Sequence, residues 1–536
     1  MTGLLGEPTF CVRWHGCDGQ ERVAHVQPSG LVTGTDAASL GIALSHEGEC
    51  WRVGVVPCRE VVIDAVEATL PADLGETQAL YLNGYNSWTD SVERDPRDRM
   101  RNFLVPRAAI RHWVLDASGD YRFVKADERS GHQHGFTYGY LRRDGEVSLV
   151  GSLGEETGMT LVREDLPAGA LLVSKEPPAA PVPAGEKRCL VGLAVLEAGS
   201  VDEAAGRWLS LCGVDAPSCS PLVGYTSWYR HYTDISEQCL LHDLDALAGC
   251  LSGYDLGSRQ PTFQVDDGYT RVGDWLQPDG EKFPRGLAPV AAATRERGIK
   301  PGIWVAPFVC ERESRLFSAH QDWLLRDDAG ELVVTGSHWS GHVALDTLNP
   351  EVRDYVARVI ATLTGEWGFS LLKCDFLYAA CMVPHGGMNR GQLMADALDL
   401  LRQSAAPGTW FDLCGVPIGS ALGRTEFCRI GCDVGLDWDG APYMRISGRE
   451  RVSTKNALGN IRGRAHMDGV AFLNDPDVFF LRDDVKLSEA QKKTLLEADA
   501  SLGSVLFTSD DMGSWSKEQK RTFEEALHAF ASRKRG

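Results

Sequence analysis

The sequence has 536 residues, and 54 Lys and Arg stand against 74 Asp and Glu, which gives a net charge of −20. A hydrophobic content of 43% and a charged content of 24% are ordinary for a folded protein, so they exclude a disordered or fibrous chain. An acidic chain repels phosphate backbones, so we expect no nucleic-acid partner. No apolar run reaches the ~18 residues of a membrane span, and the first residues lack the pattern of a signal peptide. These features predict a cytoplasmic protein of two to four domains with no membrane partner.

The fifteen cysteines include no C-x-x-C pair, and fifteen is an odd number. A secreted disulfide scaffold is usually shorter and evenly paired. We therefore expect reduced thiols, which agrees with a cytoplasmic location.

The first 213 residues are predicted to form a β-sandwich, of the kind called a supersandwich, that ends in a linker helix. Short β-branched runs such as 79–83 and 145–153 alternate with turn residues, and residues 202–213 have a helical pattern. Gly119-Asp120 and residues 143–145 are typical of hairpin turns, and the GHQHG segment at 131–135 of a surface turn.

From residue 214 to residue 515 the pattern changes to short apolar strands that alternate with amphipathic helices. Eight strands in about 290 residues predict a (β/α)8 barrel of the TIM type. The strands are expected at 221–228, 262–267, 298–308, 370–376, 409–415, 427–433, 469–475 and 503–511. Residues 516–536 are expected to form a C-terminal helix and a basic tail.

Several helix ends carry recognisable signals. Asn349 followed by Pro350 predicts an N-cap with proline at the first helical position. Gly298 is placed to end a helix, and Ser488 to begin one. Ser516 with Gln519 fits a capping box.

Polar residues follow six of the eight predicted strands. In a barrel of this type the active site lies at the carboxyl ends of the strands, so these side chains are expected to share one cleft. Any single aspartate there could instead cap a helix, but the same feature at six strands favours a site. The residues are Asp266-Asp267, Lys373 and Asp375, Asp412 and Cys414, Arg429 and Asp433, Asn474-Asp475, and Asp510-Asp511.

Carboxylates, a lysine and several tryptophans in one cleft indicate a carbohydrate ligand. Aromatic faces stack on the apolar face of a sugar ring, and carboxylates bind its hydroxyl groups. The tryptophans near strand ends or loops are Trp88, Trp228, Trp275, Trp304, Trp339, Trp410 and Trp438, although core packing would also account for Trp275 or Trp410.

Motifs for other chemistries are absent from the sequence. It contains no H-E-x-x-H, no G-x-S-x-G and no P-loop. His338 and His342 have a spacing that suits a metal only on a helix, and the surrounding glycines favour a loop. We expect neither a metal nor a cofactor.

Five segments resemble the strand-end motifs of family 36 glycoside hydrolases, the melibiase-type α-galactosidases, and the order and spacing agree with shorter, monomer-like bacterial members. The segments are FQVDDGY (263–269), KPGIWVAPF (300–308), LLKCDFLY (371–378), RIGCDVG (429–435) and FLNDPD (472–477). The resemblance implies a retaining, exo-acting α-galactosidase with Asp375 as nucleophile and Asp433 as general acid/base. Lys373 would then help to keep Asp375 ionised. Asp433 would have to be poorly solvated, or close to Asp375, to hold the proton it donates.

The resemblance also implies the substrate-binding residues. Asp266 and Asp267, with Lys373 beside them, resemble the residues that bind the 4- and 6-hydroxyls of galactose. Trp304 resembles a wall residue of the pocket, and Trp88 would reach from the β-sandwich over the barrel mouth to shape the aglycone side. Arg429, Cys414 and Gly415 resemble the elements near the sugar 2-position.

Several alternatives stay open. CGVPIG (414–419) does not decide between galactose and N-acetylgalactosamine, so an α-N-acetylgalactosaminidase is the first alternative. A non-catalytic sugar-binding barrel is the second. Family members commonly carry a β domain after the barrel, and we expect it to be absent or truncated here. The expected partners are small oligosaccharide α-galactosides, bound by a monomer or small homo-oligomer.

Overall fold

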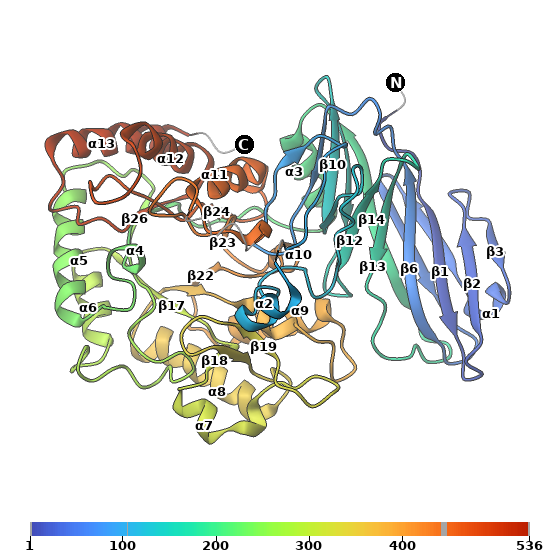
Figure 1. Ribbon diagram of the computed structural model, residues 1–536, viewed down its shortest axis with the longest axis horizontal. Helices are drawn as coiled ribbons and strands as arrows, with labels where there is room; N and C mark the ends of the chain where they lie inside the picture. The colour runs from blue at the N-terminus through green and yellow to red at the C-terminus, as the bar shows by residue number, and fades with distance from the viewer. Residues whose placement is uncertain (1–2, 104, 441–447, 534–536) are drawn as a thin grey trace.

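The computed structural model describes residues 3–103, 105–440 and 448–533, so residues 534–536 of the expected basic tail lie outside the described residues. The first 200 residues contribute two antiparallel sheets, and the remainder is built around a parallel sheet with helices outside it (Figure 1). Among the described residues, the helices are too short or too polar to cross a membrane.

The two N-terminal sheets have seven strands each and share one buried hydrophobic cluster. In β1 every second residue is buried, namely Phe10, Val12 and Trp14, as expected for a strand with one face in a core. The first sheet has the order β3 (Val32–Gly34), β2 (Glu21–Val26), β1 (Thr9–His15), β6 (Val62–Pro71), β13 (Ala170–Lys175), β12 (Thr160–Asp165) and β9 (His134–Phe136). The second has the order β4 (Ala43–Glu47), β5 (Cys50–Val55), β14 (Arg188–Ala198), β11 (Glu146–Ser152), β10 (Tyr138–Arg143), β7 (Ala79–Leu82) and β8 (Glu93–Arg94).

One of the two predicted hairpin turns is confirmed. Asp144 and Gly145 both have positive φ and join β10 to β11 in a two-residue loop. The prediction at Gly119-Asp120 is wrong, because no strand flanks it and the Asp120 carboxylate is fully buried. The predicted surface turn at 131–135 is also wrong at His134, which is buried in β9 and pairs with Asp120 at 2.7 Å. A hydrogen bond between two buried side chains, 14 positions apart in the sequence, links the two segments.

The parallel sheet contains a strand at each of the eight predicted positions. Its two end segments, β24 and β25, are separated in the chain only by Pro476 and Asp477. The order is β24 (Leu473–Asp475), β23 (Phe427–Arg429), β22 (Trp410–Leu413), β21 (Leu371–Cys374), β17 (Lys300–Val305), β16 (Gln260–Val265), β15 (Leu222–Thr226), β26 (Val505–Thr508) and β25 (Val478–Phe479). A small antiparallel sheet of β18 (Val309–Glu311), β20 (His342–Ala344) and β19 (Val334–Gly336) follows β17 in the chain.

Helix ends occur where the cap residues predicted them. The Asn349 side chain accepts a hydrogen bond from Glu351 N, and Ser488 and Ser516 begin helices with complete capping boxes. The longer helices are α3 (Val201–Leu211), α5 (Glu237–Leu251), α6 (Ala288–Glu296), α8 (Pro350–Ala361), α9 (Arg390–Ser404), α11 (Thr454–Gly463), α12 (Glu489–Leu502) and α13 (Lys517–Ser532). The shorter ones are α1 (Ala37–Leu40), α2 (Arg107–Trp113), α4 (Trp228–His231), α7 (Arg315–Ala319) and α10 (Ile418–Ala421).

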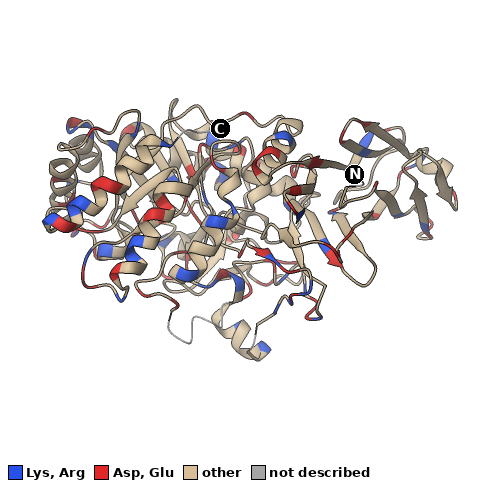
Figure 2. Ribbon diagram, turned by 90° about the horizontal axis from the view of Figure 1, so that it is seen from above, with Lys and Arg blue, Asp and Glu red and all other residues tan. Residues whose placement is uncertain are grey.

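The α2 segment brings the N-terminal part into contact with the parallel-sheet part. The segment with α2 leaves the antiparallel sheets and lies against the parallel-sheet part, near β19 (Figure 1). Arg122, shortly after α2, donates a hydrogen bond to the Val334 carbonyl at 3.0 Å, which fixes this contact. In the view of Figure 2, basic and acidic residues are interspersed along the helices of the parallel-sheet part.

Candidate active site

A cavity of about 700 Å³ opens at the carboxyl ends of the parallel strands. Both parts of the chain line it, because Trp88, residues 113–115, Ala117 and Ser118 come from the N-terminal part. Of the sequence-predicted site residues, it is lined by Trp88, Asp266, Asp267, Trp304, Lys373, Asp375, Arg429 and Asp433.

Asp375 directly follows β21, and two donors hold its carboxylate. Trp304 Nε1 donates to Oδ2 at 3.0 Å, and Phe376 N donates to Oδ1 at 2.8 Å. Burial raises the pKa of Asp375, while the charge of Lys373 and the bond from Trp304 act against the rise. The Asp375 carboxylate is thus fixed in position, and its charge depends on these two neighbours.

Lys373 pairs with Asp266, beside which the resemblance placed it, and has no direct hydrogen bond to Asp375 among the described contacts. Its ammonium donates to Asp266 Oδ2 at 3.0 Å, and that oxygen also accepts from Thr226 and Gln264. Burial alone would lower the pKa of Lys373, but the Asp266 charge raises it above its usual value. Lys373 therefore stays charged and acts on Asp375 through space.

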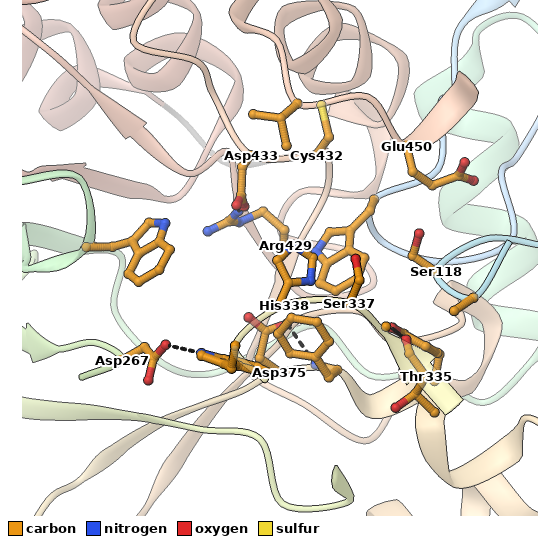
Figure 3. A pocket seen from close by; sticks show the side chains of 18 of the residues that line it. Ser118, Asp267, Thr335, Ser337, His338, Asp375, Arg429, Cys432, Asp433 and Glu450 are labelled. Atoms are coloured by element: carbon orange, nitrogen blue, oxygen red, sulfur yellow. Dashed lines mark hydrogen bonds and ion pairs between the residues drawn. The ribbon is translucent and has the colours of Figure 1, made fainter. Parts of the chain in front are cut away.

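Asp433 lies across the cavity from Asp375 (Figure 3). Its side chain is 41% exposed and pairs with Arg429 at 2.8 Å. This exposure does not meet the expectation that Asp433 is poorly solvated, which was one of the two expected conditions.

Arg429, at the end of β23, is buried among three carboxylates. Nη1 donates to Asp433, Nε to Asp475 and Nη2 to Asp477, at 2.8, 2.9 and 2.8 Å. Asp477 also accepts hydrogen bonds from Tyr229 OH and Val434 N. Burial raises the pKa of Asp477 to about 7, against the effect of Arg429. Sequence reasoning missed Asp477, although it ends the FLNDPD segment.

Asp267 occupies one end of the cavity (Figure 3). Its Oδ2 accepts from Trp339 Nε1 at 2.7 Å and its Oδ1 from Gly268 N at 2.7 Å. Burial raises the pKa of Asp267 to about 6, and the bond from Trp339 opposes this rise. Each oxygen keeps a lone pair that could accept a hydroxyl group.

Cys414 and Gly415 lie behind Trp88 and are not among the described residues that line the cavity. Trp88 Nε1 donates to Cys414 Sγ at 3.1 Å. Gly415 has φ +60°, and a Cβ there would stand 3.1 Å from the Trp88 ring. In this position the two residues support the indole from behind.

The two histidines considered as a metal pair, His338 and His342, lie in different environments. His338 lines the cavity from a loop, whereas His342 is buried in β20 and pairs with Thr335 Oγ1 at 2.8 Å. Within 3–103, 105–440 and 448–533, no group of three or more His, Cys, Asp or Glu side chains is arranged to hold a metal ion.

Sequence reasoning also missed the contribution of the 113–118 segment and of Glu450 to the cavity wall. Glu450 is buried, and its Oε1 accepts from Thr89 Oγ1 at 2.9 Å. No local motif marks either element, because both reach the cavity through contacts across the chain.

Facing carboxylates at parallel strand ends, within a cavity walled by tryptophans, are typical of glycoside hydrolases. Comparisons with known proteins agree. The Melibiase family profile matches residues 255–392. An α-galactosidase of Escherichia coli is 32% identical over 181 residues, and a probable α-galactosidase C of Aspergillus flavus is 29% identical over 168. The matched segments are 31% and 28% of this chain, and only 24% and 21% of those proteins.

Solved structures match over nearly the whole chain. An α-galactosidase from Thermus thermophilus in complex with stachyose has a TM-score of 0.73 and 26% identity, over 96% of this chain and 99% of that one. The family 36 α-galactosidase AgaA of Geobacillus stearothermophilus shares the fold, with a TM-score of 0.62 and 14% identity over 95% of this chain and 69% of that one. Residues 255–392 are thus similar in sequence to the Melibiase family, and nearly the whole chain is similar in fold to α-galactosidases, including one of glycoside hydrolase family 36.

Proposed function

We propose that the protein is a retaining, exo-acting α-galactosidase that removes terminal α-linked galactose by double displacement. The observation that carries the proposal is the pair Asp375 and Asp433 on facing walls of one cavity, with Asp375 held by Trp304 and Phe376 N. Stachyose and an aryl galactoside are bound by the Thermus thermophilus enzyme, which is 26% identical.

In the first step Asp375 attacks the anomeric carbon, and the glycosidic oxygen leaves with a proton from Asp433. The product is a β-linked galactosyl ester of Asp375. In the second step Asp433 takes a proton from water, and the water displaces Asp375 to give α-galactose. Formation of the ester removes the negative charge of Asp375, and Arg429 then stabilises the ionised Asp433 that this second step needs.

Galactose binding is assigned to the end of the cavity that holds Asp267 and the Lys373–Asp266 pair. Asp266 already accepts three side-chain hydrogen bonds on Oδ2, so its main effect is to position the Lys373 ammonium. Asp267 has free acceptor capacity and is the hydroxyl-binding carboxylate in this proposal.

The proposal includes the architecture that positions these residues. We infer that β24 and β25 are two halves of one strand, so that eight strands close into a (β/α)8 barrel. The closure is supported by the two-residue gap between them and by the bond from Ser504 N to the Asn474 carbonyl at 2.8 Å. The domains would be a β-sandwich at 1–213, the barrel at 214–515 and a C-terminal helix from 516.

Hydrolysis of p-nitrophenyl α-galactoside beside the α-N-acetylgalactosaminide tests the substrate. We expect the galactoside to be hydrolysed with the higher kcat/KM. The first sugar seen by NMR should be α-galactose, before it mutarotates. Preference for the N-acetylated sugar would assign the alternative activity, and β-galactose as the first product would overturn the retaining mechanism.

A further inference from the structure

The wall of the cavity that comes from the N-terminal part is mostly apolar, with Ser118 as a polar member. Trp113, Val114, Leu115 and Ala117 line the cavity together, and Trp113 remains 49% exposed. A half-exposed tryptophan is costly to leave in water, so a ligand that covers it gains binding free energy. This wall is separate from the carboxylates and the lysine of the barrel.

The wall is held in place by contacts on both sides. Asn86 Nδ2 donates to the Ser118 carbonyl, and the Asp120 carboxylate pairs with Arg449 and with His134. The 3.0 Å bond from Arg122 to the Val334 carbonyl joins the segment to β19. A preorganised surface of this kind binds without first paying an ordering cost.

The wall lies at the end of the cavity where the leaving group of a bound galactoside is expected. Asp267 lies at one end of the cavity, Ser118 and Glu450 lie at the other, and Asp375 and Asp433 stand between them (Figure 3). A galactosyl ring bound at Asp267 would therefore direct its anomeric oxygen toward Ser118.

Two of the polar groups at this far end already have partners, and Glu450 Oε2 is a buried acceptor without one. Glu450 accepts from Thr89 Oγ1 at 2.9 Å, and the Thr335 hydroxyl pairs with His342 at 2.8 Å. A sugar leaving group has several hydroxyl groups that need partners, whereas an aryl or alkyl group needs only apolar contact.

We propose that the 113–118 wall is an aglycone site that selects α-galactosides with an aryl or alkyl aglycone over those with a sugar aglycone. The inference rests on the proposed α-galactosidase activity and adds the class of its leaving group. Trp113 and Leu115 are the specificity-determining residues.

The test compares benzyl α-galactoside with methyl α-galactoside, whose alcohols are similarly poor leaving groups. We expect the purified protein to show a benzyl-to-methyl ratio of kcat/KM of about 10 to 100, the gain from burying one phenyl ring. In Trp113→Ala and Leu115→Ser the ratio should fall at least about threefold. Leu31→Ala, which changes an exposed apolar residue of the same N-terminal part, should keep the wild-type ratio.

Two outcomes would overturn the inference while leaving the proposed function intact. One is a wild-type ratio near one, and the other is a higher kcat/KM for melibiose, which has a sugar aglycone, than for benzyl α-galactoside. An unchanged benzyl-to-methyl ratio in both Trp113→Ala and Leu115→Ser would show that the 113–118 segment does not form the aglycone site. If neither simple galactoside nor melibiose were hydrolysed by folded protein, the proposed function itself would fail, and this inference with it.

Discussion

The indole Nε1 of Trp304 donates a hydrogen bond of 3.0 Å to Oδ2 of Asp375. This bond lowers the pKa of Asp375 against the effect of burial. In Trp304→Phe the pKa should rise, so the acidic limb of the kcat/KM–pH profile should move to higher pH. We also expect activity at neutral pH to fall about tenfold or more, because the carboxylate loses a fixed donor.

Trp275→Phe is the matched control for this prediction. Trp275 is buried beside Trp304, and its Nε1 has no hydrogen-bond partner. Its loss should leave the acidic limb in place. If both variants moved the limb equally, packing rather than the hydrogen bond would be responsible.

Replacement of Asp375 should abolish turnover without unfolding the protein. We expect Asp375→Asn and Asp375→Ala to lose about a thousandfold or more in kcat, because no covalent intermediate can form. Azide should enter the space left in Asp375→Ala and give β-galactosyl azide, which NMR identifies. Asp437→Asn, a change outside the cavity lining, should retain turnover, and wild-type kcat in Asp375→Asn would refute the nucleophile.

Substrates with poor and good leaving groups distinguish the general-acid role of Asp433 from its general-base role. In Asp433→Ala, cleavage of melibiose should slow by about 10² to 10⁴, because the departing sugar oxygen needs a proton. An activated aryl galactoside should still form the ester on Asp375 and then stall. Azide needs no general base, so it should restore turnover and give α-galactosyl azide. Equal losses on both substrates without azide rescue would instead indicate a positioning residue.

Galactose inhibition should depend on the protonation of Asp267. The pKa of Asp267 is raised to about 6, so the carboxylate is ionised above that pH and protonated below it. A hydroxyl group binds more strongly to the ionised form, so Ki for galactose should fall as the pH rises from 5 to 7. Asp267→Asn should weaken inhibition at pH 7 by about 10- to 100-fold and remove this part of the pH dependence.

Asp245→Asn, which alters an exposed carboxylate on α5, is the control for the galactose measurement. Its Ki should match that of the wild type at every pH. An unchanged Ki in Asp267→Asn would mean that Asp267 only accepts its two protein hydrogen bonds and does not bind the sugar.

Arg429 should be essential for stability as well as for activity. Arg429→Met leaves three carboxylates beside a neutral side chain, which should cost about 3–5 kcal/mol in chemical denaturation. Arg297→Met removes an exposed ion pair with Asp245 and should cost at most about 1 kcal/mol. Similar losses in the two variants would argue against a special role for the buried cluster.

The sequence alone determined the order of secondary structure in the parallel-sheet part. Each of the eight predicted strand ranges contains an observed strand or overlaps one, and the caps at Asn349, Ser488 and Ser516 begin helices. Both signals depend on residues within a few positions of each other, so a linear pattern can carry them. The same local register brought Asp266, Asp267 and Asp375 to one cavity, because parallel strands end at the same edge.

Only the tertiary structure decided the rest of the site. Cys414 follows a strand as the cavity residues do, yet it supports Trp88, which is 326 positions away in the sequence. The contact of Asp120 with Arg449 spans 329 positions and holds the apolar wall over the cavity. Such contacts depend on how the two parts of the chain pack against each other. No period or cap in either segment encodes them, because their free energy comes from partners that are distant in the sequence.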